Sequence, residues 1–159
     1  MLISDAIYGF YLHILGSNYS PITAKNYKTF LNCMIVQIGN VNIETIRKNQ
    51  IVAFLQSLWE EGKSESTVYA YWRTIRSFCN WALTELGIER PDNIPSIGFS
   101  IKPVVPFTHD EISRLLKSAE SKSNSTIILL LLDTGLRVSE AARLTIADVN
   151  LETGIAQIR

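Results

Sequence analysis

The residue best placed to do chemistry is Arg137, in the segment Thr134-Gly-Leu-Arg-Val-Ser-Glu140 that follows an apolar run. Gly135 can adopt the positive φ that ends one helix, and Leu136 can anchor the turn. A further helix is expected from about Val138 through Leu144. This spacing predicts a guanidinium held against packed structure, where two parallel hydrogen bonds can grip a phosphate.

The chain before this segment has the pattern of a helical domain. Four glycines stand 23, 23 and 25 residues apart, and each closes a stretch with apolar residues at helical spacing: Gly16, Gly39, Gly62 and Gly87. The second helix is expected to begin at Ser20-Pro21, the third at about Lys48 and the fourth near Ser64 or Ser66. Because each helix carries one apolar face, residues 1–88 are predicted to form a compact four-helix domain.

These apolar faces define the expected core. They consist of Ile3, Ile7, Phe10, Tyr11, Ile14, Tyr27, Leu31, Met34, Ile35, Ile38, Ile51, Phe54, Leu55, Leu58, Val68, Tyr71, Trp72, Ile75, Phe78, Cys79, Ala82 and Leu86. Trp59 and Trp81 follow the same period and are also expected in the core. Cys33 and Cys79 occupy apolar positions without CxxC spacing. Buried, reduced thiols in a cytoplasmic protein are therefore expected rather than a disulfide or a metal site.

The second half of the chain begins with a change of character. Residues 90–107 contain four of the five prolines: Pro91, Pro95, Pro103 and Pro106. Proline at this density predicts an extended linker, placed at residues 89–106. A helix capped by Thr108 follows, while Asn150 to Gly154 is expected as a turn and Ile155 to Arg159 as a strand. One short strand makes no stable sheet, which suggests a piece of a longer protein.

Charge is a weak indicator of partners. Fifteen basic and fifteen acidic residues give a net charge of zero, so the chain is not a strongly basic nucleic-acid binder. Arrangement is more informative, because two helices carry polar stripes opposite their apolar faces. Such stripes are either solvated helix faces or candidate DNA contacts, and they comprise Lys25 and Lys28 on the second helix, and Tyr69, Arg73, Arg76 and Asn80 on the fourth.

The segment Thr134 to Val149 resembles the first signature box of the tyrosine recombinases, the phage integrase family. The resemblance implies that Arg137 is the first of two arginines that hold the scissile DNA phosphate, and that Glu140 supports this site. Ala141 departs from the family's more frequent leucine, which affects packing and not the chemistry.

Other segments are similar to the same family, in the same order. Tyr19 to Tyr27 and Lys63 to Trp81 resemble the second and fourth helices of its core-binding, SAM-like domain, which adds Lys63 to the candidate DNA contacts. Phe107 to Leu116 resembles the opening helix of the catalytic domain. The resemblance implies a mainly α fold: a four-helix SAM-like domain over residues 1–88, a linker over 89–106, and a truncated α+β catalytic domain over 107–159.

The family resemblance also implies a mechanism for the complete protein. A tyrosine hydroxyl attacks a DNA phosphodiester to form a 3′-phosphotyrosyl link, with no metal or nucleotide cofactor, inside a tetrameric synapse on double-stranded DNA. The chain has no His-x-x-Arg sequence, and its six tyrosines all lie within residues 1–88. No residue matches the family's lysine, second arginine or tyrosine nucleophile, so the fragment is expected to be an inactive monomer.

Two other classes of function stay open on the sequence alone. Val138 to Asp148 also resembles the opening of a helix-turn-helix, as in a non-catalytic DNA-binding regulator, although Asn150 and the turn after it interrupt the expected recognition helix. The zero net charge is compatible with a helical protein-interaction module. Salt dependence distinguishes the protein-interaction module from the DNA-binding classes. For a DNA binder, the logarithm of the binding constant falls with the logarithm of the salt concentration, with a slope of about 0.9 per neutralised phosphate.

Overall fold

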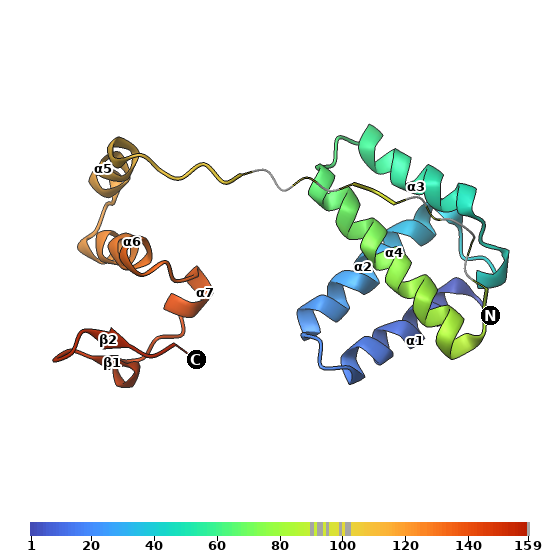
Figure 1. The fold of residues 1–159 in the computed structure, drawn as a ribbon, viewed down its shortest axis with the longest axis horizontal. Coiled ribbons are helices and arrows are strands. Elements are labelled where there is room, and N and C mark those ends of the chain that lie inside the picture. Colours follow the sequence, from blue (N-terminus) through green and yellow to red (C-terminus); the bar gives the residue numbers. More distant parts are fainter. Residues whose placement is uncertain (90, 92–93, 95, 99, 101–102, 159) are drawn as a thin grey trace. The chain divides into compact units, whose positions relative to one another are not determined.

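The computed structural model describes residues 1–89, 91, 94, 96–98, 100 and 103–158. The chain divides into two compact units, Met1–Ile101 and Lys102–Arg159 (Figure 1). Among the described residues, no helix is both long enough and apolar enough to cross a lipid bilayer.

Unit 1 is a bundle of helices, as its sequence pattern predicts. It consists of α1 (Ile3–Gly16), α2 (Pro21–Ile38), the short 3₁₀ helix η1 (Ile43–Thr45), α3 (Lys48–Glu60) and α4 (Glu65–Leu86). The predicted caps set the ends of α2 and α4. Ser20 Oγ accepts a hydrogen bond from Thr23 N at 3.1 Å, and Ser64 Oγ accepts one from Thr67 N at 3.3 Å. Gly87 ends α4 with a φ of 63°, which favours glycine.

The core lies between these four helices, with α4 packed against α1, α2 and α3 (Figure 1). Aromatic rings gather at its centre. Phe10 of α1 lies with its ring centroid 5.6 Å from that of Phe78 and 5.5 Å from that of Trp81, both on α4. Tyr27 of α2 lies 5.9 Å from the Phe10 ring. Three helices are therefore joined through one group of rings.

The structure corrects three expectations about the core. Trp59 is 45% exposed and Leu86 is 38% exposed. Both lie in the last turns of their helices, Trp59 in α3 and Leu86 in α4. Cys33 is also exposed, whereas Cys79 is buried. The buried face of α2 is centred on Leu31 and Met34, and Cys33 lies about 100° around the helix from Met34.

The segment after α4 contains no helix or strand among its described residues, as its prolines predict. Pro95 lies outside the described residues. Ile88, Ile94 and Ile97 pack against the core of unit 1. Further along, Ser100 N donates a hydrogen bond to Glu65 Oε1 at 3.0 Å. This part of the chain therefore lies along the helical unit and is not only a spacer.

Unit 2 combines helices with a small hairpin. It contains α5 (His109–Ser118), α6 (Lys122–Thr134), α7 (Val138–Ala141), the 3₁₀ helix η2 (Ile146–Asp148), β1 (Val149–Asn150) and β2 (Ile155–Ala156). Thr108 caps α5 as predicted, because Thr108 Oγ1 accepts from Glu111 N at 3.3 Å and Thr108 N donates to Glu111 Oε2 at 2.8 Å. None of the described residues of unit 2 is buried.

Two local predictions in unit 2 were wrong in detail. The helix expected from Val138 to Leu144 ends at Ala141, so only one turn of α-helix forms. The expected strand at residues 155–159 is not unpaired, because β2 pairs antiparallel with β1 and places Ile155 opposite Asn150. The intervening turn is held by Asn150 Oδ1, which accepts from Glu152 N at 2.9 Å. Arg159 lies outside the described residues.

Candidate functional site

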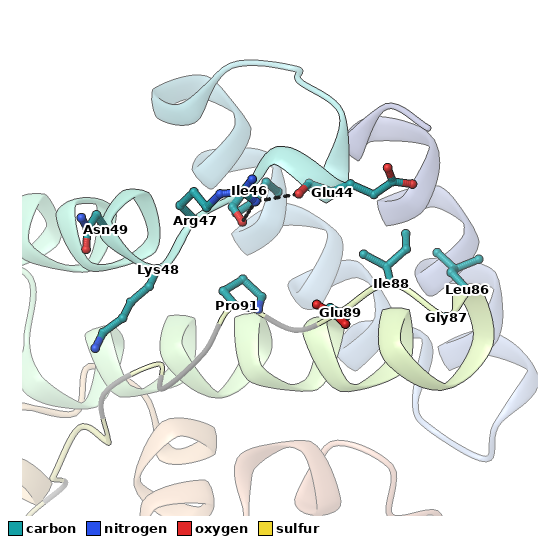
Figure 2. A pocket seen from close by; sticks show the side chains of 10 residues that line it. All are labelled: Glu44, Ile46, Arg47, Lys48, Asn49, Leu86, Gly87, Ile88, Glu89 and Pro91. Atoms are coloured by element: carbon teal, nitrogen blue, oxygen red, sulfur yellow. Dashed lines mark hydrogen bonds between the residues drawn. The ribbon is translucent and has the colours of Figure 1, made fainter.

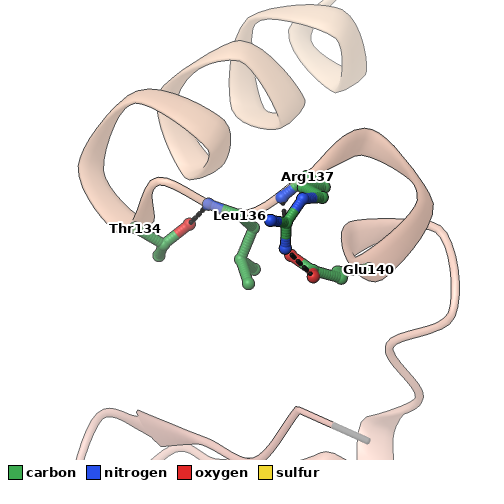
Figure 3. A network of polar contacts seen from close by, with 4 residues as sticks. All are labelled: Thr134, Leu136, Arg137 and Glu140. Carbon is green, nitrogen blue, oxygen red and sulfur yellow. Dashed lines mark hydrogen bonds and ion pairs between the residues drawn. The ribbon is translucent and has the colours of Figure 1, made fainter. Parts of the chain in front are cut away.

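The turn between α6 and α7 positions Arg137. Gly135 ends α6 with a φ of 66°, in the left-handed region that the sequence predicts. Leu136 N then donates to Thr134 Oγ1 at 3.3 Å, which holds the turn closed (Figure 3). Arg137 follows in extended conformation, with φ −71° and ψ 148°, as the residue before the first turn of α7. Its side chain therefore starts from a helix N-terminus.

Glu140 contacts Arg137 through both of its carboxylate oxygens (Figure 3). Oε2 accepts a hydrogen bond from the Arg137 backbone N at 2.8 Å, and Oε1 accepts one from Arg137 Nη1 at 2.8 Å. The backbone hydrogen bond, followed by the side-chain one, lowers the pKa of Glu140 below its ordinary value, and the charges of Arg137 and Arg143 lower it further. Glu140 is therefore ionised at neutral pH and joins the helix N-terminus to the guanidinium.

The guanidinium is not held against packed structure, contrary to the sequence expectation. The Arg137 side chain is 82% exposed, whereas that of Glu140 is 27% exposed. The reason is that unit 2 buries no described residue, so a carboxylate and not a core orients the arginine. Exposed ion pairs of this kind contribute little to stability.

Two candidate DNA contacts on α2 differ in their surroundings. Lys25 is exposed. Lys28, one turn later, is half-buried, and its Nζ lies 4.9 Å from the ring centroid of Tyr11 and 5.6 Å from that of Tyr8, both on α1. These are cation–π distances. Lys28 therefore joins α2 to α1, while Lys25 extends into solvent.

The candidates on α4 also fall into two groups. Arg73, Arg76 and Asn80 are exposed, as a DNA-facing stripe requires. Tyr69 is half-buried, and its ring is stacked on that of Trp72 with centroids 5.4 Å apart. The helical periodicity of the sequence placed Trp72 in the core and predicted no further contact for it. The Arg76 guanidinium carbon also lies 5.3 Å from the Trp72 ring centroid. The i, i+4 spacing of these two residues was the available signal for this contact, since such pairs face one another on a helix.

Lys63 lies in the turn between α3 and α4. Its Nζ is 3.6 Å from Glu61 Oε2, and the two side chains are 46% and 58% exposed. This exposed ion pair leaves Lys63 accessible at the surface. All seven candidate DNA contacts therefore belong to unit 1, whereas Arg137 and Glu140 belong to unit 2.

A surface hollow of about 770 Å³ lies elsewhere in unit 1, between the start of α3 and the end of α4 (Figure 2). Its lining mixes Arg47 and Lys48 with Glu44 and Glu89. The Arg47 guanidinium already donates to the Glu44 carbonyl oxygen at 2.8 Å. The mixed charge and this internal bond give no preference for an anionic or a cationic ligand, and no predicted site residue lines the hollow.

Comparison with known proteins defines the class. The model described as "Phage integrase, N-terminal SAM-like domain" matches residues 8–85, and the model of the "Phage integrase family" matches residues 106–159. The two models thus match unit 1 and unit 2 in turn. The order of the two matches is that of a helical N-terminal domain followed by part of an integrase domain. The chain belongs to the phage integrase family, the tyrosine recombinases, and the predictions of family and of fold class are confirmed.

Individual relatives agree with this assignment. Tyrosine recombinase XerD of Oceanobacillus iheyensis is 32% identical over 157 residues, which cover 87% of this chain and 50% of that protein. Two solved structures of lambda integrase share the fold. One is a dimer bound to a COC′ core site, with a TM-score of 0.82, 18% identity, and coverage of 100% of this chain and 62% of that one. The other is a tetramer bound to a Holliday junction, with a TM-score of 0.84, 16% identity, and coverage of 99% and 50%.

The match covers nearly all of this chain but only part of its relatives. The chain spans about half the length of the XerD proteins of Listeria innocua and Oceanobacillus iheyensis. Residues 134–140 fall inside the integrase match, and the two polar stripes of α2 and α4 fall inside the SAM-like match.

Proposed function

We propose that this chain is the DNA-binding and arginine-bearing part of a site-specific DNA recombinase. The complete protein cuts and rejoins DNA strands through a 3′-phosphotyrosyl intermediate. The observation that carries the proposal is the Arg137–Glu140 pair, which lies in the region matched to the integrase family. The lambda integrase structures, a dimer bound to a COC′ core site and a tetramer bound to a Holliday junction, support a DNA partner and assembly of the complete protein.

Arg137 is the catalytic residue of this chain under the proposal. In the reaction, a tyrosine oxygen forms a bond to the scissile phosphorus, and the bond to the 5′ oxygen breaks, with a proton passing to that oxygen. Negative charge builds on the non-bridging oxygens meanwhile. The guanidinium donates to those oxygens, and Glu140 is a positioning residue that keeps Arg137 aimed from the start of α7.

Unit 1 supplies the duplex contacts. The proposed set is Lys25, Lys28, Lys63, Tyr69, Arg73, Arg76 and Asn80. The exposure of Lys25, Arg73, Arg76 and Asn80 supports direct contact with DNA. The partial burial of Lys28 and Tyr69 supports a positioning contribution for these two. The 159-residue chain has no match to the family's second arginine or tyrosine, so we expect it to bind DNA as a monomer and to form no covalent adduct.

The helix-turn-helix alternative has little support. After the single turn of α7 the chain enters η2 and the β1–β2 hairpin. A helix-turn-helix requires a second helix of sufficient length to lie in the major groove. The part of unit 2 that is described after α7 contains no such α-helix.

DNA binding by the 159-residue chain is the first test. Binding to double-stranded DNA is measured by fluorescence anisotropy at several salt concentrations. We expect the logarithm of the association constant to fall linearly with the logarithm of the salt concentration, with a slope of about 0.9 per phosphate contact. Absence of binding at low salt would favour the protein-interaction alternative and defeat the proposal.

Catalysis by the complete protein is the second test. We expect Arg137→Ala to slow single-turnover strand cleavage by about 10²–10³. The matched control is Arg114→Ala, because Arg114 is an exposed arginine on α5 outside the proposed site. A complete protein with Arg137→Ala that recombines at the wild-type rate would remove Arg137 from the mechanism.

A further inference from the structure

Three side chains on α4 form a continuous stack. Tyr69 and Trp72 have ring centroids 5.4 Å apart with an interplanar angle of 29°. The guanidinium carbon of Arg76, four residues after Trp72, lies 5.3 Å from the Trp72 ring centroid. Trp72 is only 6% exposed and belongs to the core, whereas Arg76 is exposed. The guanidinium is thus supported by a ring that the core holds in place.

The stack leaves the hydrogen-bonding edge of Arg76 available. A guanidinium contacts an aromatic ring through its face, while its five N–H donors point outward in its plane. Among the described residues, Arg76 has no ion-pair or hydrogen-bond partner that would occupy these donors. The Trp72 ring therefore restrains the position of the guanidinium, and no described residue occupies its donors.

Arg73 is a natural comparison on the same helix. It has the same charge and is also exposed. No hydrogen bond, ion pair or ring contact is found for its side chain within the described part of the chain. Its guanidinium can therefore adopt many rotamers, and fixing one of them on binding costs conformational entropy that the stack has already removed for Arg76.

We propose that Arg76 is the residue of α4 that selects the DNA sequence, by donating two hydrogen bonds to O6 and N7 of a guanine in the major groove. Arg73 contacts phosphate and adds affinity that does not depend on sequence. The inference rests on the proposed DNA-binding function. Bidentate recognition of guanine needs two donors in a fixed plane and direction, whereas a phosphate accepts from many arginine conformers. Trp72 and Tyr69 are positioning residues for Arg76.

Selection from a pool of randomised double-stranded DNA tests this assignment. The 159-residue chain, Arg76→Gln, Arg76→Lys and Arg73→Gln are each used to enrich bound sequences at equal occupancy, and the bases at each position are counted. We expect the wild-type chain to prefer guanine at one position by about 5- to 150-fold over other bases. Both Arg76 variants lose that preference, since lysine keeps the charge but not the planar pair of donors.

Arg73→Gln is the matched control. We expect it to keep the wild-type base preference, to weaken binding to all sequences alike, and to reduce the salt slope by about 0.9. Circular dichroism checks that each variant keeps its helical content. Trp72→Phe retains a smaller ring beneath Arg76, so we expect it to weaken the guanine preference less than Trp72→Leu does.

The outcomes separate the two proposals. An Arg76→Gln chain with the wild-type base preference overturns the inference, as does loss of the preference in Arg73→Gln alone. A wild-type chain that binds DNA without any base preference also overturns it, while the proposed function survives. A wild-type chain that does not bind the pool at low salt defeats the proposed function, and the inference with it.

Discussion

Gly9 lies against the indole ring of Trp81: a Cβ atom built on Gly9 would stand 3.1 Å from Trp81 Cη2. Alanine normally stabilises a helix by roughly 0.8–1.0 kcal/mol relative to glycine. Here the added methyl group forces the ring or α1 to shift, and such overpacking typically costs about 1–3 kcal/mol. We expect Gly9→Ala to lower the free energy of unfolding in urea by about 1 kcal/mol.

Gly16, the last residue of the same helix, provides the control. A Cβ at Gly16 would meet nothing within 4 Å. We expect Gly16→Ala to raise the free energy of unfolding by a few tenths to about 1 kcal/mol. Equal stabilisation by the two substitutions would show that the Gly9–Trp81 contact does not restrict α1.

Lys28 and Lys25 are expected to differ in stability although both are lysines of α2. Lys28 lies over Tyr11 and Tyr8, and cation–π contacts contribute about 0.5–1 kcal/mol at exposed sites. We expect Lys28→Gln to lower the free energy of unfolding by this amount and Lys25→Gln to leave it unchanged. Chemical denaturation at neutral pH measures both, and equal effects would contradict a specific contribution from the rings.

Tyr71 predicts an alkaline loss of stability. Burial, then a hydrogen bond with Cys33, raises the pKa of Tyr71 to about 12. Unfolded tyrosine ionises near pH 10, so from about pH 10 to 12 the unfolded state binds fewer protons than the folded state, and the free energy of unfolding falls as pH rises. The contribution is fully present below about pH 10. We expect a loss on the order of 2 kcal/mol across this window.

The Tyr71→Phe variant tests the source of this loss. Phenylalanine keeps the ring that lies 4.4 Å from Phe30 and removes the titrating hydroxyl. We expect unfolding free energies measured between pH 9 and 12 to fall less steeply in this variant than in the wild type. Tyr19→Phe is the control, because Tyr19 is 54% exposed. The prediction fails if Tyr71→Phe and Tyr19→Phe give the same alkaline slope.

Glu140 is predicted to act through Arg137. Removing its carboxylate in Glu140→Gln takes away the charge that orients the guanidinium, but the guanidinium itself remains. We expect strand cleavage by the complete protein to slow by less than the 10²–10³ expected for Arg137→Ala. Glu152→Gln, in the exposed β1–β2 turn, is the control. A Glu140→Gln defect as large as that of Arg137→Ala would assign Glu140 a direct part in the reaction.

The pH dependence of this pair has a definite sign. Because the pKa of Glu140 is lowered, its pairing with Arg137 is complete above the ordinary pKa of a glutamate, about 4.3, and is lost only as pH falls through the lower folded value. We therefore expect no change in the contribution of Glu140 to cleavage between pH 6 and 8. The contribution is measured as the ratio of the wild-type cleavage rate to that of Glu140→Gln. A fall of this ratio between pH 6 and 8 would contradict the pairing.

The local features of the fold were predictable from the sequence. Ser20, Ser64 and Thr108 cap their helices, and Gly87 and Gly135 end helices with positive φ, as their positions predict. The apolar face of α1, and that of α4 apart from Leu86, were also assigned correctly, because helical periodicity and capping depend on residues within one or two turns. The same reasoning identified Arg137 after its turn.

Features that depend on other segments were not predictable. Periodicity placed Trp59 and Cys33 in the core, but their exposure depends on where neighbouring helices end and cross. The pairing of Ile155 with Asn150 across a turn was missed, because two-residue strands are too short to show an alternating pattern. The contact of Lys28 with the α1 rings joins residues on two helices and has no signature in either one.

Sequence alone determined where the four helices of unit 1 begin and end and which family the chain resembles, and it singled out Arg137 as the candidate for the chemistry, since each of these follows from short segments of neighbouring residues. Tertiary structure alone decided which cations rest on aromatic rings and which core positions reach solvent. It also decided that a carboxylate rather than a packed core orients Arg137. The physical reason is that burial and ring contacts depend on the distance between segments in space, which residue spacing along one helix does not encode.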